Sequence, residues 1–100
     1  MNPAARQVTI VRIYVTESRA RLERVMDLLQ KTGRVRGITV FRGVAGFGET
    51  PPQDSDASAP LDLPIVIEFF DTQVAVDDTI RFLRTMIAPH HIVTIPAELR

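Results

Sequence analysis

The chain has 100 residues, of which 45% are hydrophobic and 24% charged, with 12 basic and 12 acidic side chains and no cysteine. This size and balance predict one globular domain and exclude disulfides and thiolate metal sites. The zero formal net charge disfavours nucleic acid and anionic membranes as partners. Without a signal-peptide pattern or an apolar run of the ~20 residues that span a bilayer, we expect a cytoplasmic protein with no membrane insertion.

Residues 7–15 (QVTIVRIYV) are mostly β-branched or aromatic and alternate in the way that is typical of a strand. The next segment predicts a helix, because Ser18 is of a type that caps helices and Gly33 of a type that ends them. Its apolar residues recur at helical spacing; they are Leu22, Val25, Met26 and Leu29. We therefore expect a strand followed by a helix with one apolar side.

A second strand is predicted at residues 37–42 (GITVFR) and a third at residues 63–70 (LPIVIEFF). The segment between them is dominated by Gly, Pro, Ser, Asp and Ala, and is far too long for a hairpin turn. Connections of more than ~12–15 residues without structure of their own are uncommon in small domains and are usually functional or disordered. We expect a long flexible loop at residues 43–62.

Asp71 or Thr72 is expected to cap a second helix, which Pro89 is expected to end. The apolar residues of this helix again recur at helical spacing; they are Val76, Ile80, Leu83 and Ile87. Residues 91–95 (HIVTI) predict a final strand. Because proline has no backbone N–H to donate to a neighbouring strand, we expect Pro96 to end this strand.

The order of these elements predicts an α+β ferredoxin-like βαββαβ sandwich in a single domain, residues 1–100, with two helices on one face of a four-stranded antiparallel sheet. Both faces of the strands are apolar: in the third strand Ile65, Ile67 and Phe69 point one way, and Val66 and Phe70 the other. An uncovered apolar sheet face is of the size that marks an interface, so we expect an oligomer. The alternative is that the long loop or the C-terminal residues of the same chain cover this face.

The segments GITVFRGVAGFG and DLPIVIEFFD closely resemble the DUF190 family of the PII-like superfamily. The most specific parts are Arg42-Gly43, Gly46-Phe47-Gly48 and residues 62–66, and the resemblance covers nearly the whole chain. It implies a homotrimer with three sheets packed inward. Many PII-like proteins bind adenine nucleotides in clefts between subunits and signal through the loop to a transporter or an enzyme.

The resemblance also implies ligand contacts at the base of the loop, which are Arg42, Gly43, Gly46 and Gly48. Phe47 is either an anchor of the loop or a contact for a partner. Arg42 suits a phosphate or a carboxylate, because a guanidinium binds such groups through two N–H donors. The alternative for Arg42 is an intersubunit salt bridge, for instance to Glu68.

The two histidines, His90 and His91, are adjacent. Neighbouring residues of a strand point to opposite faces, so both cannot easily chelate one ion, and no metal or resident cofactor is predicted. They are either polar residues of a turn or ligand contacts that a trimer brings to the loop base of a neighbour. Arg12 and Glu68 lie within otherwise apolar strands, where we expect them to pair with each other.

The sequence has no cysteine nucleophile and neither an H-E-x-x-H nor a G-x-S-x-G motif, so the protein is not expected to be an enzyme. The leading hypothesis is a PII-like regulatory or sensor trimer that binds a small anionic ligand, with an adenine nucleotide as a candidate. It would signal to a protein target through the loop at residues 43–62. The alternative is a ligand-free protein-interaction module built on the same trimer, and the third hypothesis is an enzyme that uses the trimer clefts.

Overall fold

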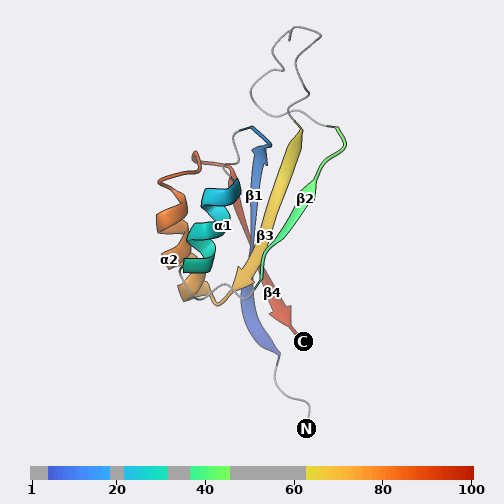
Figure 1. Cartoon of the computed structure of the whole chain (residues 1–100). Helices are drawn as coiled ribbons and strands as arrows, with labels where there is room; N and C mark the ends of the chain where they lie inside the picture. The colour runs from blue at the N-terminus through green and yellow to red at the C-terminus, as the bar shows by residue number, and fades with distance from the viewer. Residues whose placement is uncertain (1–4, 19–21, 32–36, 46–62) are drawn as a thin grey trace, which may run out of the picture.

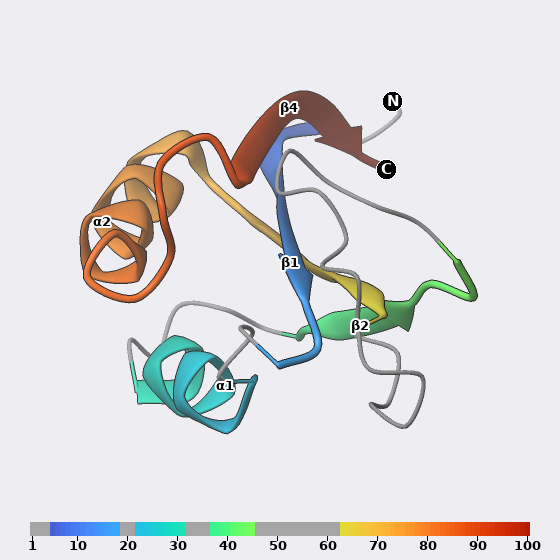
Figure 2. The same cartoon turned by 90° about the horizontal axis from the view of Figure 1, so that it is seen from above.

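The computed structural model describes residues 5–18, 22–31, 37–45 and 63–100. Its elements, in chain order, are β1 (Arg6–Thr16), α1 (Leu22–Lys31), β2 (Thr39–Arg42), β3 (Pro64–Asp71), α2 (Gln73–Leu83) and β4 (Ile92–Leu99). The four strands form one antiparallel sheet in the order β2-β3-β1-β4, and both helices cover the same face of it (Figures 1 and 2). The predicted ferredoxin-like βαββαβ sandwich is confirmed.

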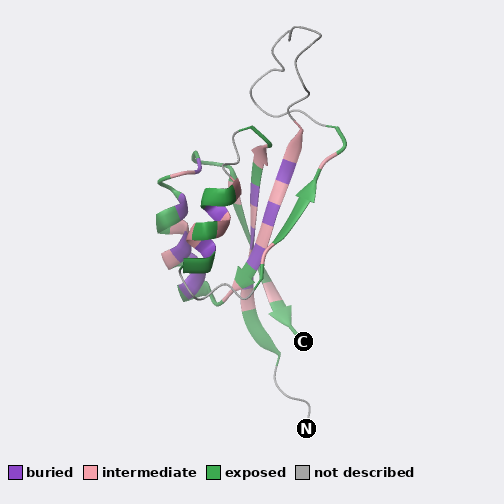
Figure 3. Cartoon of the chain, viewed as in Figure 1, coloured by how far each residue is buried: buried purple, intermediate pink, exposed green. Residues whose placement is uncertain are grey.

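The hydrophobic core lies between the two helices and one face of the sheet (Figure 3). Alternation along β1 and β3 sends every second side chain to this face, which we call the helix side. The strands contribute Val11, Ile13, Ile65, Ile67 and Phe69, and the helical region contributes Val25, Leu29, Val76, Leu83 and Ile87. All of the apolar helical positions expected from the sequence are buried except Leu22, Met26 and Ile80, which are half-buried, and Leu22 and Ile80 pack against the core.

The start of α2 is set by Thr72, one of the two caps, Asp71 or Thr72, that the sequence predicts. Thr72 has extended backbone angles (φ −61°, ψ 157°), and its hydroxyl accepts a hydrogen bond from the Ala75 N–H at 3.3 Å. Buried Thr9 of β1 donates to the Gln73 side chain at 2.7 Å, which ties this end of the helix to the sheet. Residues 19–21 and Gly33 lie outside the described residues, so the predicted cap and stop of α1 stay predictions.

The prediction that α2 continues to Pro89 is wrong, because the regular helix ends at Leu83. Beyond it the chain tightens: the Thr85 N–H donates to Phe82 O at 3.1 Å and the Met86 N–H to Leu83 O at 2.9 Å. The Thr85 hydroxyl also donates to Phe82 O, at 2.7 Å, and so satisfies a carbonyl at the helix end. The apolar spacing nevertheless continues, because this turn keeps Ile87 buried in the core.

The prediction that Pro96 ends the last strand is also wrong, since β4 continues through it to Leu99. The Tyr14 N–H donates to His91 O at 2.8 Å, and hydrogen-bonded and non-hydrogen-bonded pairs alternate along antiparallel strands. Tyr14 and His91 form a hydrogen-bonded pair, and the two kinds of pair alternate from there along the strands. The pair of Thr9 and Pro96 is therefore a non-hydrogen-bonded one. Its nitrogen therefore faces the free edge of the sheet, where a missing N–H costs nothing. The strand itself begins at Ile92, one residue later than expected, and β2 begins at Thr39 instead of Gly37.

The second face of the sheet, which we call the open face, is covered by no described element (Figure 2). The registers align its side chains in rows across the strands. Apolar side chains dominate these rows and include Phe41, Val66 and Tyr14, then Phe70, Ile10 and Ile95. Tyr14, Phe41, Phe70 and Val93 are each between 41% and 51% exposed. An apolar surface of this kind on a single chain is typical of an interface.

One charged pair interrupts the open face. Arg12 and Glu68 are opposite each other in the β1–β3 register, and their Nη2 and Oε1 atoms are 3.8 Å apart. Their side chains are 39% and 24% exposed. The predicted pairing of these two residues is confirmed.

Candidate functional site

The candidate ligand residues gather at one end of the sheet, which we call the loop end. Here β1 and β2 finish while β3 and β4 begin, so the segment that joins β2 to β3 starts and returns at this end (Figure 1). Two backbone hydrogen bonds extend the strand pairing beyond the regular sheet. The Glu17 N–H donates to Leu63 O and the Gly43 N–H donates to Pro64 O, each at 2.8 Å. Backbone hydrogen bonds therefore join the strand ends at the loop end.

Gly43 is required at the loop end by close packing. A Cβ atom at this position would lie 2.7 Å from Cγ of Pro64 and 3.1 Å from its carbonyl oxygen, both closer than such contacts normally are. Only glycine fits without a shift of the proline ring or of the backbone. This packing explains Gly43 without a ligand, and its role in ligand binding stays a prediction.

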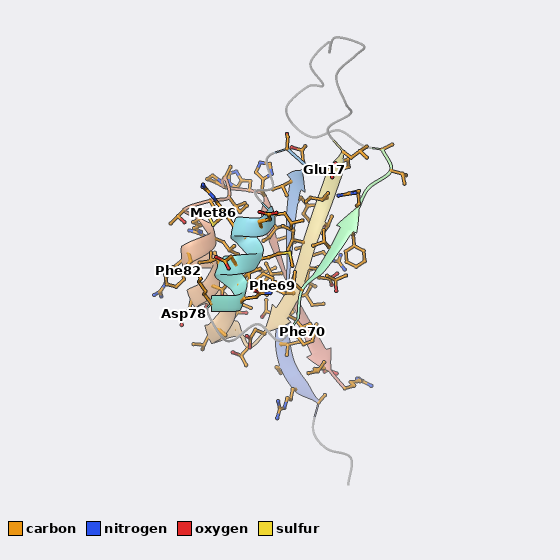
Figure 4. All side chains as sticks on the ribbon, viewed as in Figure 1. Glu17, Phe69, Phe70, Asp78, Phe82 and Met86 are labelled. Carbon is orange, nitrogen blue, oxygen red and sulfur yellow. The ribbon has the colours of Figure 1, made fainter. Side chains whose placement is uncertain are left out.

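Arg42 forms an ion pair with Glu17, whose side chain is labelled at the loop end in Figure 4. Nη2 of Arg42 lies 2.6 Å from Oε1 of Glu17, and the side chains are 65% and 43% exposed. Within the chain, Arg42 thus pairs with Glu17, while Glu68 pairs with Arg12. The sequence reasoning missed Glu17, although the strand order expected from the βαββαβ pattern brings the ends of β1 and β2 to the same end of the sheet.

His91 is held by the backbone of β1. Its Nδ1 lies 2.8 Å from the carbonyl oxygen of Tyr14, and because a carbonyl only accepts, Nδ1 carries the proton in this contact. The free ring nitrogen of the neutral side chain is then Nε2. Tyr14 belongs to the open face, so His91 lies at the edge of that face.

His90 has a positive φ of 69°, a conformation that favours glycine. It lines a groove of about 720 Å³ between α2 and β4, together with the arginines at the end of α2, Arg81 and Arg84. The strand residues of this groove are Ile92 and Thr94, which place the groove on the helix side. The two adjacent histidines, which both precede β4, thus lie on different surfaces.

Within one chain the predicted ligand residues do not converge. Arg42 ends β2 and Gly43 follows it, at one edge of the sheet, whereas His90 and His91 precede β4, at the other edge. Three interstrand spacings separate the two edges, or about 14 Å at about 4.8 Å each. Gly46, Phe47 and Gly48 lie outside the described residues, and the described part contains no group of three or more side chains that could hold a metal.

The family model for DUF190, described as "Uncharacterized ACR, COG1993", matches residues 8–99. The chain belongs to the DUF190 family. A comparison of this DUF190 chain with curated proteins gives no match. Neither of the helices that the structure describes is long and apolar enough to cross a membrane.

Solved structures of PII-like proteins resemble this DUF190 chain. CPII from Thiomonas intermedia K12 bound to ADP and bicarbonate is 18% identical, with a TM-score of 0.66 over 96% of this chain and 89% of that one. CPII bound to ADP, AMP and acetate is 16% identical, with a TM-score of 0.63 over 97% and 90%. A candidate PII-like signaling protein from Thermus thermophilus is 13% identical, with a TM-score of 0.62 over 97% and 91%. These similarities show that the chain has a PII-like fold.

Proposed function

We propose that this DUF190 protein is a PII-like regulatory trimer that binds a small anionic ligand in clefts between its subunits. The observation that carries the proposal is the position of the cationic residues at the two edges of the sheet. Arg42 and the groove with His90, Arg81 and Arg84 lie at the same end of the sheet and on its helix side, but at opposite edges.

A ring of chains with the open faces inward makes these two edges neighbours. In a head-to-tail ring, the β2 edge of one subunit meets the β4 edge of the next, and the helix side of both faces outward. Arg42 of one subunit then approaches the His90 groove of another. Two sheets stacked face to face would instead leave their helix sides pointing away from each other. Burial of the open face and completion of the cleft therefore favour the same arrangement.

We infer the ligand class from the guanidinium groups of the cleft; Asp77 also lines the groove, and Arg81 lies 3.7 Å from Asp78. Guanidinium groups pair with carboxylates and phosphates through charge-assisted hydrogen bonds. The CPII structures contain ADP with bicarbonate or with AMP and acetate, all of which carry such groups. An adenine nucleotide, bicarbonate or both are accordingly the ligands to test. The loop at residues 43–62 would carry the bound state to a protein target.

Isothermal titration calorimetry tests ligand binding directly. The ligands are ADP, ATP, AMP, cyclic nucleotides and bicarbonate, each with and without Mg²⁺. We expect binding of at least one of them, weakened by Arg42→Gln and unchanged by Arg6→Gln at the opposite end of β1. Absence of heat for every ligand refutes the sensor function. If the protein captures a protein target, and this capture is lost on deletion of residues 50–59 and unaffected by every nucleotide, a ligand-free interaction module is favoured.

A further inference from the structure

The ion pair between Arg42 and Glu17 joins the only charged residue of β2 to the turn that follows β1. Each partner lies beside a described backbone hydrogen bond that already fixes the loop end, through Glu17 and Leu63 on one side and Gly43 and Pro64 on the other. An exposed ion pair adds little to the stability of a fold. The pair is therefore not needed to hold these strands together.

The carboxylate of Glu17 belongs to the same chemical class as the proposed ligands. It is a planar oxyanion, and at 2.6 Å it occupies the Nη2 side of the guanidinium that would otherwise receive a ligand. A guanidinium has five N–H donors, and an incoming anion that uses those of Nη2 competes with Glu17 for Arg42.

There is room for such an exchange next to the ion pair. A shallow groove that is largely open to solvent runs along the start of α1, and its described lining residues are Glu17, Ser18, Leu22, Glu23 and Arg24. Glu17 thus stands between this groove and Arg42. A second acid, Glu23, lines the same groove but pairs with no described arginine, which makes it a matched control.

We propose that Glu17 is a built-in competitor that sets which anions can bind at Arg42. A ligand binds only if its oxyanion replaces the Glu17 carboxylate, and the displaced side chain turns into the groove along α1. Acceptors that offer only one oxygen are rejected, while phosphates and oxyanions that offer two oxygens to the guanidinium, such as carboxylates and bicarbonate, are accepted. This inference rests on the proposed function, because it assumes that Arg42 contacts the ligand.

The test compares four proteins by calorimetry with ADP and with bicarbonate: wild type, Glu17→Gln, Glu23→Gln and Arg42→Gln. Removing the competitor exchanges an exposed ion pair for a neutral amide, so we expect Glu17→Gln to tighten binding about two- to fivefold. Glu23→Gln should leave the affinity unchanged. Arg42→Gln should weaken binding about tenfold or more, since it removes a charge-assisted contact.

The outcomes separate the two proposals. No binding by any of the four proteins overturns the proposed function and this inference with it. Binding by the wild type that Glu17→Gln leaves unchanged or weakens overturns the competition alone. Equal tightening by Glu17→Gln and Glu23→Gln also overturns it, because it reveals a general charge effect. As a second readout, the ¹³C signal of the Glu17 carboxyl group should shift on ligand addition in the wild type and stay unchanged in Arg42→Gln.

Discussion

The charge pair on the open face offers a sharp prediction. In the single chain, Arg12 and Glu68 are 39% and 24% exposed and their closest atoms are 3.8 Å apart. Glu68→Gln removes the negative partner and leaves Arg12 among apolar rows. If subunits bury this face, Arg12 becomes an unpaired buried charge, which costs about 3–5 kcal/mol per subunit. If the face stays in water, losing an exposed pair costs at most about 1 kcal/mol.

Replacing both residues should have the opposite effect. Arg12→Met combined with Glu68→Leu leaves no unpaired charge, and such replacements of buried ion pairs are often neutral or stabilising by about 1–4 kcal/mol. The control is Asp27→Asn, which breaks the Asp27–Lys31 pair of α1, with a distance of 3.1 Å and side chains 62% and 76% exposed. This variant should lose no more than about 0.5 kcal/mol.

The assay is urea unfolding followed by circular dichroism at two protein concentrations, with the mass in solution measured for each variant. We expect Glu68→Gln to dissociate into smaller species and to unfold at lower urea, while the double variant remains assembled. The reasoning is refuted if Glu68→Gln and Asp27→Asn lose the same small amount and the mass does not change.

Three further substitutions test local features, each by the free energy of unfolding at a fixed protein concentration. Gly43→Ala forces a Cβ to within 2.7 Å of the Pro64 ring and should lower the free energy of unfolding by about 1–3 kcal/mol. An unchanged stability would mean that the proline ring or the backbone shifts to make room for the Cβ. Thr72→Ala removes the N-cap acceptor of α2 and should cost about 1 kcal/mol, and no loss would contradict the capping role. His90→Gly relieves the positive φ of 69° and should stabilise the fold by about 0.5–1 kcal/mol, whereas destabilisation would point to a contact of the imidazole that holds the turn.

The arrangement of the strands could be predicted because each carries its own signal. Alternation in β1 and β3 indicated two apolar faces, and the structure divides them into a core face and an open face. Thr72 was found because a cap is a local feature of a few residues. The pairing of Arg12 with Glu68 followed from two charges in otherwise apolar strands, and the register confirms it.

The errors arose where the outcome depends on the position of an element in the sheet. A proline interrupts a strand only where its nitrogen would have to donate a hydrogen bond to a neighbouring strand. Pro96 avoids this because β4 is an edge strand and because its register with β1 points the Pro96 nitrogen away from β1. The early end of α2 at Leu83 escaped notice because Ile87 keeps the apolar spacing after the helix has tightened into a turn.

The candidate site was only partly accessible from the sequence. Arg42 was singled out by the resemblance to the family, and His90 and His91 by residue type, but their separation on opposite edges became clear only with the strand order. Glu17 was missed because it is an ordinary acid just after a strand, and its importance comes from a partner, Arg42, that ends β2. Gly43 was expected to serve a ligand, and the structure adds a packing reason that requires knowledge of the neighbouring Pro64.

The most direct test of the central claim is a native mass spectrum of the protein purified gently from its own cells. The account predicts a mass of about 34 kDa, three times the 11.2 kDa of one chain, plus a small-molecule adduct that Arg42→Gln removes. A trimer without an adduct would support the burial of the open face but contradict the proposal that the protein binds a small-molecule ligand. A single chain of 11.2 kDa at micromolar concentration would contradict the account as a whole, because the open face would then be stable in water.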